Sequence, residues 1–155
     1  YEMLQVNINA LIQLTHAVLP QMLKRKKGLI INNSSVVSIL QVPGASTYAA
    51  SKAAVLTFTN SLRQELKGTG VKTLVLLTPG IKTRMYDQIE KLYGKNFDLN
   101  WDDGLSADKY AEMIREAILE DLEVLSPGGF TGAAMNLARY LPSVFEKGVS
   151  WKFKR

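Results

Sequence analysis

GLIINNSS, residues 28–35, is a short and nearly continuous apolar run that begins with a glycine and ends in two serines. A run of this length is typical of a buried strand rather than of a helix. Two longer stretches flank it, residues 3–23 and 48–66, and their apolar side chains recur mostly at steps of three and four residues. That periodicity predicts a helix on each side of the strand, with one face of each helix packed against a core.

A second strand is predicted over residues 71–77, a β-rich stretch that stops at Pro79 and Gly80. Helix, strand, helix and strand joined by short connections are the pattern of a doubly wound parallel sheet of the α/β class. Sites in such sheets lie beyond the carboxyl ends of the strands, which is where Ser35 falls. We expect residues 1–155 to form a single domain of this kind.

The remainder of the chain predicts three further elements. Ser106 is expected to cap a helix whose inner apolar stripe ends near Asp121. Residues 124–125 read as a short edge strand. Residues 130–145 predict an amphipathic terminal helix that is broken at Pro142.

The composition is that of an ordinary globular protein. The 155 residues are 46% hydrophobic and 21% charged, which suits one substantial core. The absence of cysteine excludes disulfides, thiolate metal sites and thiol nucleophiles, and it fits a reducing, cytoplasmic compartment. The net charge of +5 is mostly dispersed and has no binding motif, so we expect no nucleic-acid partner. His16 has no second histidine or carboxylate cluster with it, so no metal site is expected.

Tyr48 and Lys52 lie four residues apart at the start of the second predicted helix, so they share one helix face. A free phenol has a pKa of about 10, and a nearby cation lowers that pKa because it favours the phenolate. Tyr48 could then act as a general acid or base on a carbonyl or alcohol, with Ser35 hydrogen-bonded to the same substrate oxygen. The pair alone is a weak pattern, and a packed aromatic with a solvent-facing hydroxyl is the other interpretation.

Several elements together resemble a known family. The strand ending in Ser35, the Tyr48-x-x-x-Lys52 helix, the next strand and the segment Pro79-Gly80-Ile81-x-Thr83 are similar to the C-terminal part of a short-chain dehydrogenase/reductase. The resemblance covers residues 1–85 strongly and residues 105–130 more loosely. It implies the C-terminal part of a doubly wound, Rossmann-type fold.

The resemblance also implies an activity. Members of the family are NAD(P)-dependent oxidoreductases that interconvert a carbonyl and a secondary alcohol by hydride transfer. Residues 84–105 correspond to the family's variable substrate loop. The aromatic residues of this loop mildly favour an apolar small-molecule substrate, such as a lipid, steroid or aromatic ketone.

The family's catalytic roles fall on four residues here. By the resemblance, Tyr48 is the acid/base, Lys52 lowers its pKa and holds the nicotinamide ribose hydroxyls, and Ser35 polarises the substrate oxygen. In the family an asparagine on the preceding helix completes the set. Asn7, 28 residues before Ser35, fits that position and would support a water-linked proton relay, while Asn9 is the competing candidate.

The cofactor site follows from the same resemblance. It assigns nicotinamide binding to Tyr48, Lys52, Pro79, Gly80, Ile81 and Thr83. The Ile81 backbone and the Thr83 hydroxyl would hold the carboxamide. The cofactor would be NADP or NAD, with NADP slightly favoured. Neither the family's glycine-rich phosphate loop nor the residue that selects between the two is present in the sequence.

This departure from the family predicts a fragment, a cleaved product or an incompletely sequenced protein. Without about half of the sheet, strand 29–34 would lack a neighbour and both long helices would lose part of their cover. We therefore expect the isolated chain to aggregate or to stay loosely folded, without a sharp two-state thermal transition. The alternative function is a truncated, non-catalytic oligomerisation or interaction fragment.

Two kinds of macromolecular contact are expected besides the small-molecule substrate. In the family, the helices that correspond to residues 3–23 and 49–66 often pack against their copies, which implies a homodimer or homotetramer. Residues 130–145 and the basic, aromatic tail at 151–155 indicate a peripheral membrane contact as an added property.

Overall fold

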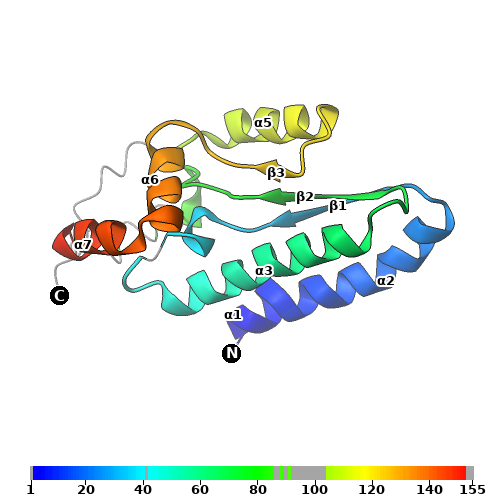
Figure 1. Ribbon diagram of the computed structural model, residues 1–155, viewed down its shortest axis with the longest axis horizontal. Helices are drawn as coiled ribbons and strands as arrows, with labels where there is room; N and C mark the ends of the chain where they lie inside the picture. The colour runs from blue at the N-terminus through cyan, green and yellow to red at the C-terminus, as the bar shows by residue number, and fades with distance from the viewer. Residues whose placement is uncertain (1, 41, 86–87, 89–90, 92–103, 153–155) are drawn as a thin grey trace.

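Three parallel strands form the sheet, in the order β1-β2-β3. The structure is a computed structural model that describes residues 2–40, 42–85, 88, 91 and 104–152. β1 (Gly28–Asn33) pairs along its whole length with β2 (Val71–Leu76), and β3 (Val124–Leu125) extends the sheet on the other side of β2 (Figure 1). The strands predicted from the sequence and their parallel direction are confirmed.

Helices cover the sheet on both faces. α2 (Ala10–Lys24) and α3 (Ser46–Glu65) lie on one face, and α5 (Ala107–Leu119) lies on the other (Figure 1). β2 runs between these layers, so Leu74 and Val75 are both fully buried although they point to opposite faces. A strand covered on both faces needs a nearly continuous apolar sequence, which is why this segment could be recognised. The fold is the α/β, Rossmann-type arrangement that we expected.

Each face of the sheet has its own apolar core. The core under α5 consists of Leu74, Leu76, Tyr110, Ala117 and Leu125. The core under α2 and α3 consists of Ile30, Leu62, Leu66 and Val71. Burial of these side chains holds the helices against the strands and thereby fixes the strand ends.

The first predicted helix is not a uniform α-helix. A short α1 (Glu2–Leu4) leads into a π-helical turn, η1 (Gln5–Asn9), which precedes α2. At its end the Ala10 N–H donates to the Gln5 carbonyl, five residues back instead of four. π turns frequently occur at functional sites, and this one contains Asn7.

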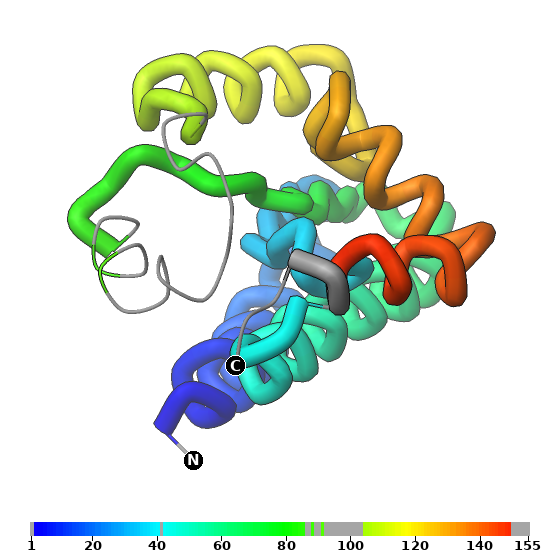
Figure 2. Tube along the Cα trace, turned by 90° about the vertical axis from the view of Figure 1, so that its left-hand side faces the viewer, coloured from blue at the N-terminus to red at the C-terminus, as the bar shows by residue number. Residues whose placement is uncertain are grey.

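α6 (Gly129–Tyr140) and α7 (Pro142–Lys152) lie beside the carboxyl ends of the strands (Figures 1 and 2). The break between them confirms the interruption predicted at Pro142. The cap predicted at Ser106 is also confirmed, because its Oγ accepts the Lys109 N–H at 3.3 Å. In the described part of the chain, no helix is long and apolar enough to cross a membrane.

Most of the expected substrate loop, residues 84–105, lies outside the described residues. The two ends of the segment are joined by a parallel bridge between Ile81 and Leu105. The Leu105 N–H donates to the Gly80 carbonyl and the Lys82 N–H donates to the Leu105 carbonyl, each at 2.9 Å. Both ends of the loop are therefore held near the end of β2.

β1 is an edge strand, since among the described residues only β2 pairs with it. Leu29 and Ile31 are 37% and 39% exposed, as expected for a strand that lacks a neighbour. The pairing with β2 nevertheless continues past the ends of both strands. The Ser34 N–H donates to the Leu76 carbonyl at 2.9 Å, and the Val36 N–H donates to the Thr78 carbonyl at 3.1 Å.

Candidate active site

Ser35 lies two residues after the end of β1, and its hydroxyl both accepts and donates a hydrogen bond. Its backbone is extended, and it caps a short 3₁₀ turn, η2 (Val36–Ser38), by accepting the Val37 N–H at 3.4 Å. The same hydroxyl donates to the carbonyl of Thr78, just past β2, at 3.2 Å. Ser35 is buried, so its hydroxyl is held at the carboxyl ends of β1 and β2.

Tyr48 and Lys52 lie in the first two turns of α3 and share one face, as predicted. The Lys52 Nζ lies 5.7 Å from the centroid of the Tyr48 ring. It donates to the carbonyl of Asn33, the last residue of β1, at 2.9 Å. The structure therefore brings Ser35, Tyr48 and Lys52 together at one end of the sheet.

Side chains of β1 and of the residue after it hold α3 in place, and the sequence did not reveal this. The Ser34 hydroxyl donates to the Lys52 carbonyl at 2.8 Å, while the Lys52 side chain donates to the Asn33 carbonyl. Two turns further along α3, the Asn32 amide donates to the Thr59 hydroxyl at 2.9 Å. Asn32, Ser34 and Thr59 are all buried, and buried polar groups that are bonded in this way fix the position of the helix on the strand.

The two candidate asparagines are clearly separated by the structure. The Asn7 amide donates to the Ser51 hydroxyl at 3.0 Å, and that hydroxyl donates to the Tyr48 carbonyl at 2.7 Å. The Asn9 amide instead donates to Gln5 at 2.8 Å on the exposed side of the π turn. The structure therefore places Asn7, and not Asn9, against the helix that carries Tyr48.

Burial sets the pKa values of the pair. It raises the pKa of Tyr48, and a hydrogen bond with the Ser35 side chain lowers that pKa without cancelling the effect. Burial also lowers the pKa of Lys52, because it disfavours the ammonium. Our expectation that Lys52 gives Tyr48 a net lower pKa is wrong for this structure. The ammonium is bonded to the Asn33 carbonyl, and removal of the half-buried phenol from water is the largest influence on the pKa of Tyr48.

The segment predicted to wrap the nicotinamide follows β2 at the same end of the sheet. Pro79 and Gly80 come after Thr78, whose carbonyl holds Ser35, and Ile81 forms the bridge to Leu105. Thr83 is exposed. Pro79 and Gly80 thus follow the residue that anchors Ser35, and the contacts of all four residues with a cofactor stay a prediction.

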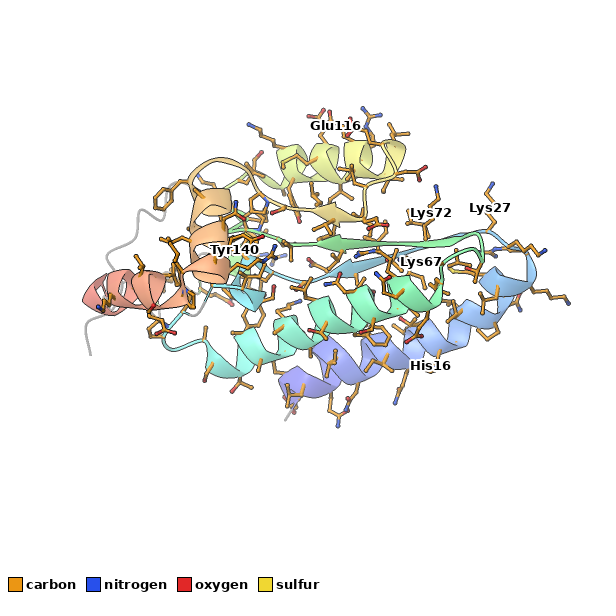
Figure 3. The ribbon with its side chains drawn as sticks, viewed as in Figure 1. His16, Lys27, Lys67, Lys72, Glu116 and Tyr140 are labelled. Atoms are coloured by element: carbon orange, nitrogen blue, oxygen red, sulfur yellow. The ribbon has the colours of Figure 1, made fainter. Side chains whose placement is uncertain are left out.

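Several other ionisable groups lie away from this end. His16 is exposed on the outer side of α2, and Lys27, Lys67 and Lys72 gather at the end where the strands begin (Figure 3). Within the described residues, no group of three or more histidine, cysteine, aspartate or glutamate side chains could hold a metal ion. The side chains suited to acid–base chemistry that we identified, Ser35, Tyr48 and Lys52, therefore lie at the carboxyl ends of β1 and β2.

The contrast between Asn7 and Asn9 gives a matched pair of variants. Asn7→Ala is expected to lower the free energy of unfolding by about 1 kcal/mol, since it removes a partly buried hydrogen bond to Ser51. Asn9→Ala removes an exposed bond from the same turn and is expected to change it by less than about 0.5 kcal/mol. Urea denaturation followed by circular dichroism measures both, and equal losses would contradict the assignment of Asn7.

The sequence of this chain is similar to those of known proteins. Residues 1–93 match the family model described as short chain dehydrogenase. An uncharacterized oxidoreductase of Staphylococcus saprophyticus is 34% identical over 125 residues, which are 79% of this chain and 51% of the relative. The 3-oxoacyl-(acyl-carrier-protein) reductase of Thermotoga maritima is 36% identical over 86 residues, which are 56% of this chain and 35% of that protein.

The fold is also similar to those of solved structures. A short chain dehydrogenase from Burkholderia cenocepacia, solved in complex with NADP, superposes with a TM-score of 0.78 at 18% identity, covering 94% of this chain and 56% of that one. The chain thus spans about half or less of the length of the curated relatives it matches. Because the family model matches more than half of the chain, residues 1–155 belong to the short-chain dehydrogenase family.

Proposed function

We propose that the protein carrying this chain is an NAD(P)-dependent oxidoreductase that interconverts a carbonyl and a secondary alcohol. The observation that carries the proposal is the cluster of Ser35, Tyr48 and Lys52 at the carboxyl ends of β1 and β2. Family membership supports it, as do the reductase and oxidoreductase names of the relatives. The substrate we propose is an apolar small-molecule ketone or alcohol.

The described residues fit the nicotinamide end of such a cofactor. An ammonium has three N–H donors, and in the described part of the chain the Asn33 carbonyl takes one from Lys52. The other two can bind the vicinal hydroxyls of a ribose. Tyr48 lies beside this ammonium, and the Pro79–Gly80 turn follows β2 at the same end. NADP and NAD fit this end equally well, since they differ at the adenosine ribose.

The chain's own residues would manage the proton at the substrate oxygen. Tyr48 gives its phenolic proton to the oxygen during reduction and takes it back during oxidation. The Ser35 hydroxyl orients that oxygen once its hydrogen turns from the Thr78 carbonyl to the substrate. Lys52 holds its charge near the phenol, while Asn7 positions the first turn of α3 through Ser51. The nicotinamide, when bound, supplies or accepts the hydride.

The raised pKa of Tyr48 predicts a pH dependence with opposite signs in the two directions. Reduction needs the protonated phenol, and burial keeps it protonated, so kcat/KM for reduction should stay level between about pH 6 and pH 8 and fall only at alkaline pH. Oxidation needs the phenolate, so its kcat/KM should rise with pH across the same range. Initial rates measured in both directions check this. A fall in the reduction rate across neutral pH would contradict the assignment.

The activity itself is tested on the whole protein that carries this chain. We expect a panel of apolar ketones to give carbonyl-dependent consumption of NADPH or NADH, followed as loss of absorbance. Equilibrium binding of both cofactors, measured by calorimetry, separates NADP from NAD. No cofactor binding and no turnover with the whole protein would contradict the proposal.

A second candidate function is an interaction module, and one surface favours it. α1, η1 and α2 expose a row of apolar side chains, with Val6 70%, Leu14 66% and Val18 43% exposed. Together with Leu29 and Ile31 of β1 they line an open groove of about 550 Å³. Apolar surface of this kind is typical of a protein contact, and in a chain that acts as a truncated interaction fragment a copy of the same chain would bury it.

Replacing Leu14 by glutamate should weaken self-association by about ten-fold or more, because an unpaired carboxylate would be buried in the contact. His16→Glu, on the outer side of the same helix (Figure 3), is the matched control and should have little effect. Multi-angle light scattering over a concentration series measures both. Equal oligomeric states for the two variants would show that this surface is not part of the contact.

A further inference from the structure

Three polar side chains form a hydrogen-bonded chain on the α5 side of the candidate site. The Tyr110 hydroxyl, on α5, lies 2.8 Å from the Thr78 hydroxyl. The Thr78 hydroxyl donates to the side-chain carbonyl of Asn33. A hydroxyl has one hydrogen to give, so Tyr110 must be the donor to Thr78. The chain therefore runs in one direction, from Tyr110 through Thr78 to Asn33.

The backbone carbonyls of two of these residues hold the candidate catalytic side chains. The Asn33 carbonyl accepts the Lys52 ammonium at 2.9 Å. The Thr78 carbonyl accepts the Ser35 hydroxyl at 3.2 Å and the Val36 N–H at 3.1 Å. Lys52 and Ser35 are thus anchored to two residues whose side chains are bonded to each other.

The position of these hydrogen-bonded side chains explains why they would affect the geometry of the site. Asn33 is the last residue of β1, and Thr78 lies two residues beyond β2. The side-chain bond between them adds to the backbone pairing that continues past the two strand ends. Tyr110 is only 8% exposed and belongs to the core under α5, so the packing of its ring in that core fixes the position of its hydroxyl. The burial of Tyr110 raises its pKa and keeps it a donor.

We propose that Tyr110, Thr78 and Asn33 are positioning residues that set the places of the Lys52 ammonium and the Ser35 hydroxyl. They act through the ends of β1 and β2 and do not themselves touch the reacting atoms. The kinetic part of the test rests on the proposed oxidoreductase function, whereas the chemical reactivity of Lys52 can be measured without cofactor or turnover.

The first experiment measures how fast Lys52 reacts with acetic anhydride, by mass spectrometry of the labelled whole protein without cofactor. Thr78→Val removes the hydroxyl and keeps the shape of the side chain, and Tyr110→Phe removes only the donor oxygen. Both should raise the rate at Lys52 by about two- to ten-fold, the factor that corresponds to one ordinary hydrogen bond. Thr78→Val removes the bond that holds the Asn33 side chain, and Tyr110→Phe removes the donor that orients the Thr78 hydroxyl in that bond. Thr78→Ser keeps the hydroxyl and should restore the original rate.

Two variants control for the substitutions themselves. Thr57→Val on α3 and Tyr140→Phe on α6 make the same chemical changes at exposed positions. They should leave the rate at Lys52 unchanged. If Thr78→Val and Tyr110→Phe also leave it unchanged, or if Thr78→Ser alters it as much as Thr78→Val does, the proposal is overturned. Should Thr78→Val fold poorly, Tyr110→Phe decides alone, because it keeps the buried ring.

The second experiment follows turnover of the whole protein with its cofactor. Thr78→Val and Tyr110→Phe should lower kcat by roughly ten-fold with little change in KM, since displacement of catalytic groups affects the reacting geometry more than binding. Loss of thermal stability with an unchanged kcat would mean a purely structural role and would overturn the proposal. An inactive parent protein would instead contradict the proposed function, and the labelling of Lys52 would still decide the positioning role.

Discussion

Replacing Tyr48 by phenylalanine is expected to lower kcat for carbonyl reduction by about one hundred- to ten-thousand-fold, the range that general acid–base catalysis supplies. The substitution removes the only phenolic proton beside Lys52 in the described part of the chain. The phenyl ring stays in place, and the hydrogen bonds of Ser34 and Asn32 that hold α3 on β1 are not affected. The rate should therefore fall without a loss of folded protein.

The same variant distinguishes the enzyme from an interaction module. Cofactor binding should weaken only slightly, because Lys52 keeps its bond to Asn33, and the oligomeric state should not change. Steady-state kinetics, calorimetry and light scattering on the whole protein measure these three properties. Tyr140→Phe, at a position that is 73% exposed, is the matched control and should retain full activity. A Tyr48→Phe variant with ordinary turnover would exclude Tyr48 as the acid.

The largest effect on stability is expected from Leu74→Ala. Leu74 is fully buried in β2 and packs in the core that includes Tyr110 and Ala117. Truncation of a buried leucine removes apolar contacts and leaves a cavity, which costs about 2–5 kcal/mol. Because domains are stable by only about 5–15 kcal/mol, this one change should lower the midpoint of denaturation sharply.

Leu119→Ala provides the comparison for that measurement. Leu119 ends α5 and is 69% exposed, so its truncation should cost less than about 1 kcal/mol. Guanidinium denaturation of the whole protein, followed by circular dichroism, gives both values. Similar losses in the two variants would mean that the core under α5 is not packed as the structure describes.

The order of the elements could be read from the sequence because burial leaves a regular pattern. β2 is apolar over Leu74–Leu76, where both of its faces are covered. The cap at Ser106 and the break at Pro142 depend on single residues with strong local preferences. The π turn could not be predicted in the same way. Leu4 and Ile8 keep the four-residue step of an α-helix, so the extra residue in the turn changes no periodicity.

The candidate site was predictable where the chemistry lies in a short motif and not where it depends on distant partners. The spacing of Tyr48 and Lys52 placed both on one helix face. It could not show that burial raises the pKa of the phenol, because burial depends on the whole fold. The bonds from Thr78 to Asn33 and to Tyr110 span 45 and 32 residues, and no local pattern marks such pairs.

The continuation of pairing past the ends of β1 and β2 has a consequence for the dynamics of the site. The Ser34 and Val36 amides lie beyond β1, yet they donate to the Leu76 and Thr78 carbonyls. Amides at frayed strand ends exchange with deuterium through small local openings, whereas amides in cooperative units exchange only when the unit opens. These two protons should therefore exchange as slowly as those in the middle of β2. The strand ends that carry the site would then open only when the sheet opens.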